Sequence, residues 1–285
     1  MEEISPSLPI AVHRGDPDRA TLFKLLEDAD VILNGHTYID ADLLRSAPSL
    51  KTIIFLGTGA ASYIDMEAAR DLGISVEVIT NYGDTAVAEH TLALTLSAIR
   101  HVVLMDRDVR AGHWEPLEGR EFSEMTVGVI GLGGIGRQFA RLADNVGFSV
   151  LGWNRSGVEP SPHIELAEID DLLSRSDVIS LHLRLNDYTT KFLDNARLKL
   201  LPRDAIVVNT ARAGLIDTDV LVHHLTEGTL GHAALDVFDH EPLGAQHALC
   251  ELPNVTLTAH AGFKTRPAMR RLLEQALVVA GKVVR

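Results

Sequence analysis

The segment at residues 131–136 constrains the fold of this chain more than any other feature. It reads Gly-Leu-Gly-Gly-Ile-Gly, follows a β-branched run at 126–130, opens a helical pattern at 135–146 and precedes a second β-branched run from Val150. Gly131 permits a tight turn, Gly133 lets the backbone approach a pyrophosphate, and Gly136 lets helix and strand pack closely. A bare motif of this kind also occurs in turns without a ligand. Its place between strand and helix favours a dinucleotide site with an anion at the helix N-terminus.

Strand and helix patterns alternate along the whole chain, which predicts an α/β fold with parallel sheets covered by helices on both faces. We expect two doubly wound domains, Rossmann-like or flavodoxin-like, with a cleft between them. Strands are expected at 10–12, 31–33, 53–55, 76–78, 127–130, 150–153, 178–183, 206–208, 233–237 and 255–258. Helices are expected at 19–27, 40–46, 65–72, 135–146, 164–174, 194–200 and 218–227, with Asp16, Asp40 and Asp65 as N-caps and Gly73 as a helix stop.

Two apolar helical segments indicate how the domains are organised. Residues 85–110 form one long helical pattern whose apolar positions are too dense for a narrow face, which suits a helix between two domains or two subunits. The final pattern, from about 266 to 285, has no strand after it, and we expect it to pack on the first domain. The predicted domains are therefore 1–90 plus 265–285 and, inserted between them, 91–264.

Composition excludes several classes of protein. The net charge of −13 argues against a nucleic-acid partner, so an anion site must be built locally from an arginine or from backbone N–H groups. The single cysteine, Cys250, cannot form an intramolecular disulfide and has no partner for a zinc cage. His223 and His224 lack other ligands at metal spacing, and we interpret them as a solvated pair with no metal. The N-terminus lacks the features of a signal peptide, and no apolar run reaches membrane-spanning length, so we expect a cytoplasmic protein with no membrane partner.

The residues after the strand at 150–153 bear on the choice of dinucleotide. An NAD site carries an Asp or Glu here for the ribose 2′-OH, whereas this chain has Asn154, followed by Arg155 and Ser156. A carboxylate would repel a 2′-phosphate by about 4 kcal/mol at close range and an effective dielectric constant near 20. Asn154 removes that repulsion, and Arg155 supplies donors, which favours NADP(H) over NAD(H). The alternative is that Asn154 bonds the 2′-OH of NAD while Arg155 points into solvent.

Three segments with chemically apt residues each follow a predicted strand. They contain Arg212, Glu241 and His260, and they should meet at the carboxyl edge of the sheet, where open α/β folds bind ligands. Reduction of a 2-keto acid needs a cation for the carboxylate and carbonyl and a proton donor that titrates near neutral pH. Taken singly, each could be a surface arginine, a turn glutamate or a structural histidine. Their joint pattern points to a catalytic site.

With these segments, the sequence resembles the D-isomer-specific 2-hydroxyacid dehydrogenase family over nearly the whole chain, from Gly57-Thr-Gly59 through Val87-Ala-Glu-His90 to His260-Ala-Gly262. The resemblance implies hydride transfer between NADP(H) or NAD(H) and a small 2-keto or D-2-hydroxy acid. It makes residues 91–264 the dinucleotide-binding domain and the other segments the substrate-binding domain. It assigns Arg212, Glu241 and His260 to catalysis, and Gly134, Ile135, Asn154, Thr210, Ala211 and Asp236 to the cofactor. It places the backbone N–H groups of Leu56, Gly57, Thr58 and Gly59, with Arg212, on the substrate carboxylate.

Some residues depart from the family pattern. Ala259 stands where a proline usually precedes the histidine, Phe263 and Lys264 stand where small residues are commoner, and His182-Leu-Arg184 replaces His-x-Pro. The N-terminal segment is short for the family, which predicts a trimmed first domain. These departures leave the local shape of the site open.

The resemblance is strongest to NADPH-using glyoxylate and hydroxypyruvate reductases, because of the Trp-Asn-Arg-Ser stretch at 153–156. Two alternatives stay open: an enzyme like D-3-phosphoglycerate dehydrogenase, for which no second basic group is evident, and a dinucleotide-sensing regulator on the same fold. Formate oxidation is disfavoured because no Gln precedes His260. The family also implies a homodimer formed through the helical region at 85–110.

Overall fold

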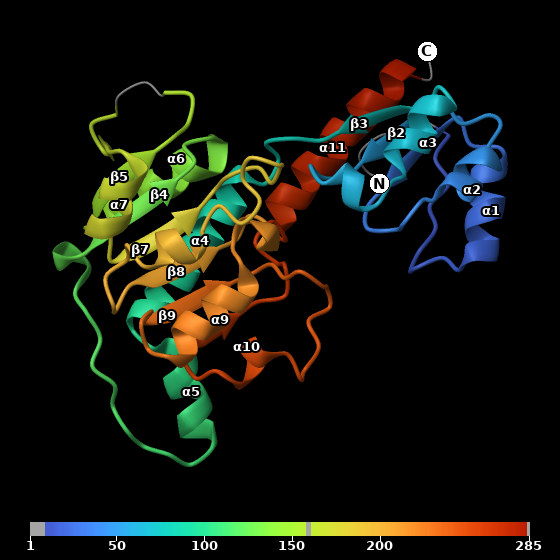
Figure 1. Ribbon diagram of the computed structural model, residues 1–285. Coiled ribbons are helices and arrows are strands. Elements are labelled where there is room, and N and C mark those ends of the chain that lie inside the picture. The colour runs from blue at the N-terminus through green and yellow to red at the C-terminus, as the bar shows by residue number, and fades with distance from the viewer. Residues whose placement is uncertain (1–8, 158–160, 284–285) are drawn as a thin grey trace. The chain divides into compact units, whose positions relative to one another are not determined.

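The computed structural model describes residues 9–157 and 161–283. The chain divides into two compact units. Unit 1 runs up to Gly83 and resumes at Thr265, and unit 2 comprises Asp84–Lys264. The predicted boundary after residue 90 falls inside helix α4 (Asp84–Ile99), which belongs wholly to unit 2 (Figure 1).

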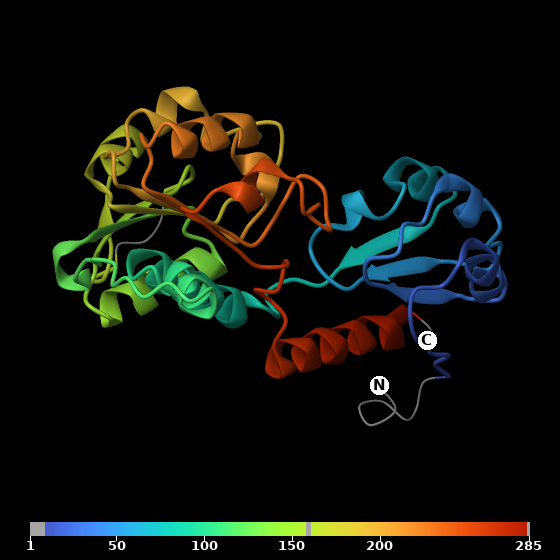
Figure 2. The ribbon, with the colours of Figure 1, turned by 90° about the horizontal axis from the view of Figure 1, so that it is seen from below.

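Unit 1 contains a three-stranded parallel sheet in the order β1-β2-β3. The strands are β1 (Val31–Asn34), β2 (Thr52–Phe55) and β3 (Ser75–Val78), and the helices are α1 (Arg19–Glu27), α2 (Ala41–Arg45), α3 (Met66–Asp71) and α11 (Arg266–Val283). Neighbouring residues of β2 point to opposite faces, so Ile53 joins the core under α2 while Ile54 packs with Leu272 and Ala276 of α11. Figure 2 shows α11 lying along one face of this sheet. The last helix thus completes the core of unit 1, as the sequence predicted.

The N-terminal predictions for unit 1 are partly wrong. Residues 10–12 form no strand, because no neighbouring strand pairs with them, and Val12 is exposed. Helix α1 is capped by Asp18, whose Oδ1 accepts from the Thr21 N–H at 2.8 Å, rather than by Asp16. The caps at Asp40 and Asp65 are confirmed, since each carboxylate accepts from the backbone N–H three residues later. Gly73 ends α3 in the left-handed region, with φ of 73°.

Unit 2 contains a seven-stranded parallel sheet in the order β10-β9-β8-β7-β4-β5-β6. Its strands are β4 (Thr126–Ile130), β5 (Ser149–Trp153), β6 (Glu165–Leu166), β7 (Val178–Leu181), β8 (Ile206–Asn209), β9 (His232–Leu235) and β10 (Val255–Leu257). The order reverses at β4, because β5 and β6 extend to one side and β7 to β10 to the other. That reversal is the topological switch point at which doubly wound sheets bind ligands.

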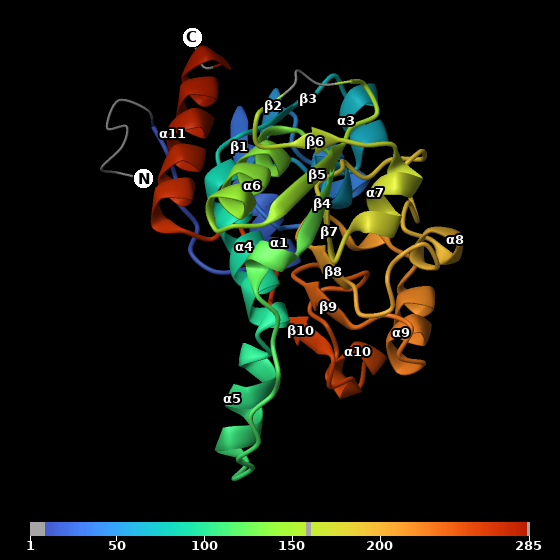
Figure 3. The ribbon, with the colours of Figure 1, turned by 90° about the vertical axis from the view of Figure 1, so that its left-hand side faces the viewer.

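Two layers of helices cover this sheet (Figure 3). One face packs on α4 and on α6 (Gly134–Asn145), in a core that includes Val127, Phe139 and Val208. The other face packs on α7 (Ile169–Arg175), α8 (Asn195–Leu198) and α9 (Thr218–Thr226). Strands β7, β8 and β9 are buried throughout, as expected for central parallel strands that helices cover on both faces.

Two helix predictions in unit 2 need correction, and one further helix was missed. The single helix expected at 85–110 is two helices, α4 and α5 (Val102–Arg110), because His101 takes a left-handed conformation with φ of 50° and interrupts the hydrogen-bond ladder. The helix expected at 164–174 is the short edge strand β6 followed by α7. Helix α10 (Ala248–Glu251) was not predicted at all. Within the described ranges, no helix combines the length and apolar character needed to cross a bilayer.

Candidate active site

The glycine segment forms the turn between β4 and α6, at the switch point of the sheet. Gly131 has φ of 98°, and its N–H donates to the Trp153 carbonyl at 2.9 Å. A Cβ on Gly131 would lie 2.7 Å from the His182 carbonyl oxygen, and one on Gly136 would collide with the Gly131 carbonyl oxygen. Neither position tolerates a side chain, so strand, turn and helix can be this close only with glycine.

The same turn fits the pyrophosphate of a dinucleotide. A Cβ at Gly133 would have no described atom within 4 Å, so this face of the turn is open to a ligand. Gly133 is the N-cap of α6, and no side chain of the described residues caps that helix. The first-turn N–H groups and the positive end of the helix dipole are therefore available for an anion. Asp84 lies against Gly134, and burial raises the pKa of this carboxyl group.

Asn154 links the end of β5 to the glycine turn. Its Oδ1 accepts from the Leu132 N–H at 3.1 Å, and its Nδ2 donates to Ser156 Oγ at 3.1 Å. The guanidinium of Arg155 lies over the Tyr188 ring, 5.9 Å from the centroid. The sequence did not single out Tyr188, because this contact joins two loops that are far apart in the chain. The structural feature that draws attention to Tyr188 is its exposure, because 84% of the surface of this aromatic residue is accessible.

His260 and Glu241 form a hydrogen-bonded pair at the carboxyl edge of the sheet. His260 Nδ1 lies 2.7 Å from Glu241 Oε2, and Oε1 of the same carboxylate accepts from the Phe238 N–H at 3.0 Å. Because an ionised carboxylate can only accept, Nδ1 carries the proton. The Nε2 atom is then left for proton exchange with a ligand. The Phe263 ring packs edge-on against the imidazole, with 6.1 Å between centroids.

Asp236 holds the backbone that presents His260. The His260 N–H donates to the Asp236 carbonyl at 2.8 Å, and the Ala261 and Gly262 N–H groups donate to the two carboxylate oxygens at 2.9 Å each. His260 itself has φ of 48°, which is rare outside glycine. Burial alone would raise the pKa of Asp236, but hydrogen bonds from His90, Thr258 and the two N–H groups lower it to about 2. The carboxylate therefore stays ionised and clamps the turn.

Arg212 lies in the turn after β8. The side-chain amide of Asn209 braces this turn, because it donates to the Arg212 carbonyl at 2.9 Å and accepts from the Ala211 N–H at 3.0 Å. Strands β8, β9 and β10 are consecutive neighbours, so the turns with Arg212, Glu241 and His260 emerge side by side at one edge. Thr210 and Ala211 lie in the same turn as Arg212.

The segment from Leu56 to Gly59 follows β2 in unit 1. The Leu56 N–H donates to the Asn34 carbonyl at 2.7 Å, and the Gly57 N–H donates to the Phe55 carbonyl at 2.8 Å. These two N–H groups are therefore engaged inside unit 1.

Two further histidines lie in buried or partly buried surroundings. His224 is 5% exposed, and its ring nitrogens bond Thr229 Oγ1 and Asn195 Oδ1, so the interpretation of a solvated pair with His223 is wrong. His182 is partly buried behind the glycine turn, where it bonds Ser180 Oγ at 2.9 Å, and desolvation lowers its pKa to about 3. The residues that the structure describes contain no cluster able to hold a metal.

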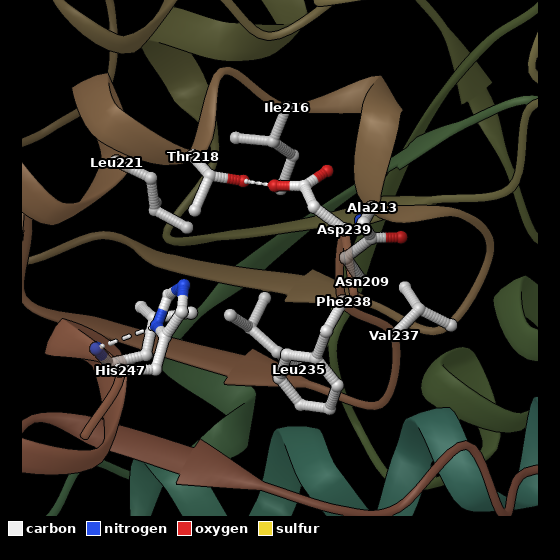
Figure 4. A pocket seen from close by; sticks show the side chains of 11 residues that line it. Asn209, Ala213, Ile216, Thr218, Leu221, Leu235, Val237, Phe238, Asp239 and His247 are labelled. Carbon is white, nitrogen blue, oxygen red and sulfur yellow. Dashed lines mark hydrogen bonds between the residues drawn. The ribbon is translucent and has the colours of Figure 1, made fainter. Parts of the chain in front are cut away.

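A small pocket lies beside the turns that follow β8 and β9 (Figure 4). Apolar side chains make up most of its walls, including Ile216, Leu221 and Phe238. Thr218 Oγ1 donates to Asp239 Oδ2 at 2.7 Å across it, which ties the segment that carries Glu241 to the start of α9. Its lining includes neither Glu241 nor His260.

The chain is similar to known proteins of one enzyme family. Residues 92–262 match the family model described as D-isomer specific 2-hydroxyacid dehydrogenase, NAD binding domain. A glyoxylate reductase of Aeropyrum pernix is 37% identical over 273 residues, which cover 91% of this chain and 81% of that protein. Other relatives bear the names hydroxypyruvate reductase, in Thermotoga maritima, and D-3-phosphoglycerate dehydrogenase, in Methanocaldococcus jannaschii, at 32% and 36% identity.

Solved structures show the same likeness. The TT0316 protein of Thermus thermophilus superposes with a TM-score of 0.85 at 36% identity, covering 95% of this chain and 90% of that one. An acyclic imino acid reductase solved with NADPH and D-Arg has a TM-score of 0.79 at 29% identity, covering 92% and 84%.

The fold and site define a two-unit oxidoreductase whose second unit binds a nicotinamide dinucleotide. The chain belongs to the D-isomer specific 2-hydroxyacid dehydrogenase family.

Desolvation of the His182 imidazole makes unit 2 sensitive to acid. Its pKa is about 3 in the folded chain against an ordinary value of 6.5, so the unfolded state binds the proton first. Its contribution to stability is therefore lost as the pH falls from about 6.5 toward 3, by roughly 1 kcal/mol per pH unit. We expect His182→Gln to flatten this part of the curve of unfolding free energy against pH, measured by urea denaturation. His113→Gln, at an exposed ring, is the control for the change from histidine to glutamine. Parallel curves for all three proteins would contradict the prediction.

Proposed function

We propose that this protein reduces glyoxylate or hydroxypyruvate to the corresponding 2-hydroxy acid, with a D-configured product where the carbon is chiral. The observation that carries the proposal is the His260–Glu241 pair, next to the Arg212 turn at the carboxyl edge of a sheet with a dinucleotide turn. The names of the relatives from Aeropyrum pernix and Thermotoga maritima support this substrate class.

The proposed chemistry divides the work among three side chains. The guanidinium of Arg212 binds the substrate carboxylate and polarises the keto oxygen, where negative charge grows during reduction. His260 donates the proton from Nε2 to that oxygen, and the carboxylate of Glu241 holds the ring and stabilises its charged form. A bound nicotinamide supplies the hydride that completes the reduction. One hydride and one proton add across the carbonyl, and the reverse reaction returns both.

The roles of the two units are part of this proposal. Unit 2 holds the dinucleotide through Gly131, Gly133, Gly134, Ile135 and Gly136, together with Asn154, Arg155, Ser156, Thr210, Ala211 and Asp236. Unit 1 contributes substrate binding through the segment from Leu56 to Gly59. A cytoplasmic location stays a prediction from the sequence.

Substitution of the two central residues tests the reaction. His260→Ala should lower kcat by about 10²- to 10⁴-fold, because general acid catalysis is lost. Arg212→Ala should lower kcat and also raise KM steeply, and Arg212→Lys should recover only part of the loss, since a lysine lacks the bidentate fork. The measurement is oxidation of NADPH and NADH with glyoxylate, hydroxypyruvate, pyruvate and bulkier 2-keto acids. Dinucleotide affinity, measured by fluorescence titration, should survive in His260→Ala.

The same assay separates an enzyme from a dinucleotide-sensing regulator. Tight dinucleotide binding without turnover of any keto acid would support the regulator and refute the proposed reaction. Near-normal kinetics in Arg212→Ala or His260→Ala would remove that residue from the mechanism.

We propose NADP(H) as the preferred dinucleotide. Asn154 already accepts from the Leu132 N–H, and aspartate could make the same bond, so Asn154→Asp adds charge with little change of shape. The added charge should repel a 2′-phosphate and accept from a 2′-OH. We expect the ratio of kcat/KM for NADPH over NADH to fall by about tenfold or more. Ser156→Ala, which removes a neutral hydroxyl, is the control and should shift the ratio less. An unchanged ratio in Asn154→Asp would contradict the preference.

We also propose a homodimer formed through α5. None of the nine residues of α5, all of them described, is buried. Val102 and Val109 are 52% and 51% exposed, and the segment after the helix exposes 87% of Trp114 and 36% of Leu117. Exposed apolar side chains grouped on α5 and the segment after it favour an interface in which a second copy of the chain buries them.

Light scattering coupled to size-exclusion chromatography tests the dimer. The wild-type protein should elute as a dimer, and Val102→Asp with Val109→Asp should produce monomers, because a charge in an apolar interface is costly. Val278→Asp, at a valine of α11 that is 60% exposed, is the control and should leave the dimer intact. A monomeric wild-type protein would refute the proposal.

A further inference from the structure

Two adjacent residues of α4 each bond to a different turn at the carboxyl edge of unit 2. His90 Nε2 lies 3.0 Å from Thr258 Oγ1, in the turn that leads into His260. Thr91 Oγ1 lies 2.8 Å from Thr210 Oγ1, in the turn that leads into Arg212. One turn of a single helix therefore contacts both of the segments that carry the proposed catalytic side chains.

The direction of the His90 bond follows from its neighbours. Thr258 has one hydroxyl proton, and it donates that proton to Asp236 Oδ1 at 2.6 Å. Thr258 Oγ1 can then only accept from His90, so Nε2 of His90 carries a proton. The same Nε2 lies 3.4 Å from Asp236 Oδ1. His90, Thr258 and Asp236 thus form one network, and its carboxylate accepts from the Ala261 and Gly262 N–H groups, which directly follow His260.

The Thr91 bond is directed in the same way. Thr91 donates its own proton to the Val87 carbonyl at 2.7 Å, so its oxygen accepts from the Thr210 hydroxyl. Thr91 is fully buried and Thr210 is 7% exposed. A hydroxyl in such surroundings that lost its partner would remain unsatisfied, which makes the pair a specific link. Thr210 starts the turn that Asn209 braces and that places Arg212 two residues later.

These turns need external support. His260 has a backbone conformation that a non-glycine residue rarely adopts, and the Arg212 turn is irregular until the short helix at Ala213–Leu215. Side chains that touch only the turns can set where the guanidinium and the imidazole lie. Supporting contacts of this kind decide whether a site is held to within a fraction of an ångström.

We propose that His90 and Thr91 are positioning residues for the two halves of the catalytic site: His90 places His260 through Thr258, and Thr91 places Arg212 through Thr210. The proposal rests on the proposed function, because it takes the roles of His260 and Arg212 from it. It goes further by assigning separate tasks to two neighbouring residues of α4, each of which contacts a different turn. The tasks differ in kind, since one concerns proton transfer and the other substrate binding.

Valine and serine variants test this division. Thr91→Val keeps the shape of the side chain and removes the hydroxyl, and we expect it to raise KM for the keto acid about tenfold with little change in the pH profile of kcat. Thr258→Val removes both the partner of His90 and a donor to Asp236, and we expect kcat to fall about tenfold and the limb of its pH profile that reports His260 to move. His90→Leu should reproduce the Thr258→Val pattern. Thr91→Ser and Thr258→Ser retain the hydroxyl, and His90→Gln retains a donor. These three variants should therefore keep most of the wild-type kcat and KM.

Thr95→Val is the matched control. Thr95 is also fully buried in α4, but its hydroxyl donates to the Thr91 carbonyl at 2.8 Å, inside the helix itself. Thr95→Val therefore measures how much a buried valine in α4 changes stability and kinetics when no bond to either turn is removed. Thermal unfolding and dinucleotide titration of every variant show whether the fold and the dinucleotide site survive.

The outcomes are separable. If Thr91→Val and Thr258→Val behave like Thr95→Val, or change KM and kcat in the same proportions as one another, the positioning proposal is wrong. If a valine variant or His90→Leu does not fold, the serine and glutamine variants decide, since full wild-type kinetics in them supports the links and a loss in them refutes the assignment. If Arg212→Ala and His260→Ala retain turnover, the proposed function itself has failed. If Arg212→Ala and His260→Ala lose turnover while the His90, Thr91 and Thr258 variants keep it, the proposed function stands and only the inference about α4 fails.

Discussion

The buried carboxylate of Asp236 organises the carboxyl edge of unit 2. It accepts hydrogen bonds from Thr258, Ala261 and Gly262, and the carbonyl of the same residue accepts from His260. Those bonds outweigh the cost of burying the charge, which is why the pKa of Asp236 falls to about 2 although burial opposes ionisation. Without an ionised acceptor here, the Thr258 hydroxyl and the Ala261 and Gly262 N–H groups would lose their hydrogen-bond acceptor. The unusual backbone of His260 would also lose its support.

This clamp works because of the order of the strands. Strands β8, β9 and β10 are parallel neighbours, so each presents its C-terminal turn at the same edge. The middle turn carries both Asp236 and Glu241, and each of them bonds to the turn that follows β10. The imidazole is thus held by its ring and by its backbone from one neighbouring strand end. Helix α4 adds a second support from outside the sheet, through His90 and Thr91.

The dinucleotide turn illustrates how glycine is used where two backbones approach closely. The carbonyl of His182 lies where a side chain on Gly131 would be, and the carboxylate of Asp84 lies where one on Gly134 would be. Asn154 then fastens the turn to the end of β5, through the Leu132 N–H. The residue proposed to decide between NADP(H) and NAD(H) is therefore hydrogen-bonded to the turn proposed for the pyrophosphate.

The sequence by itself determined the parallel α/β architecture of unit 2, because its strands are buried on both faces and its motifs follow strand ends. It also determined the glycine turn and the three turns with Arg212, Glu241 and His260, since parallel strands must place these turns at one edge. Only the tertiary structure decided the break at His101, the replacement of Asp16 by Asp18 as a cap, and the burial of His224. Each of these depends on local backbone geometry or on a distant partner that no periodicity records. The contacts of His90 and Thr91 belong to the same group, because they join residues 168 and 119 positions apart.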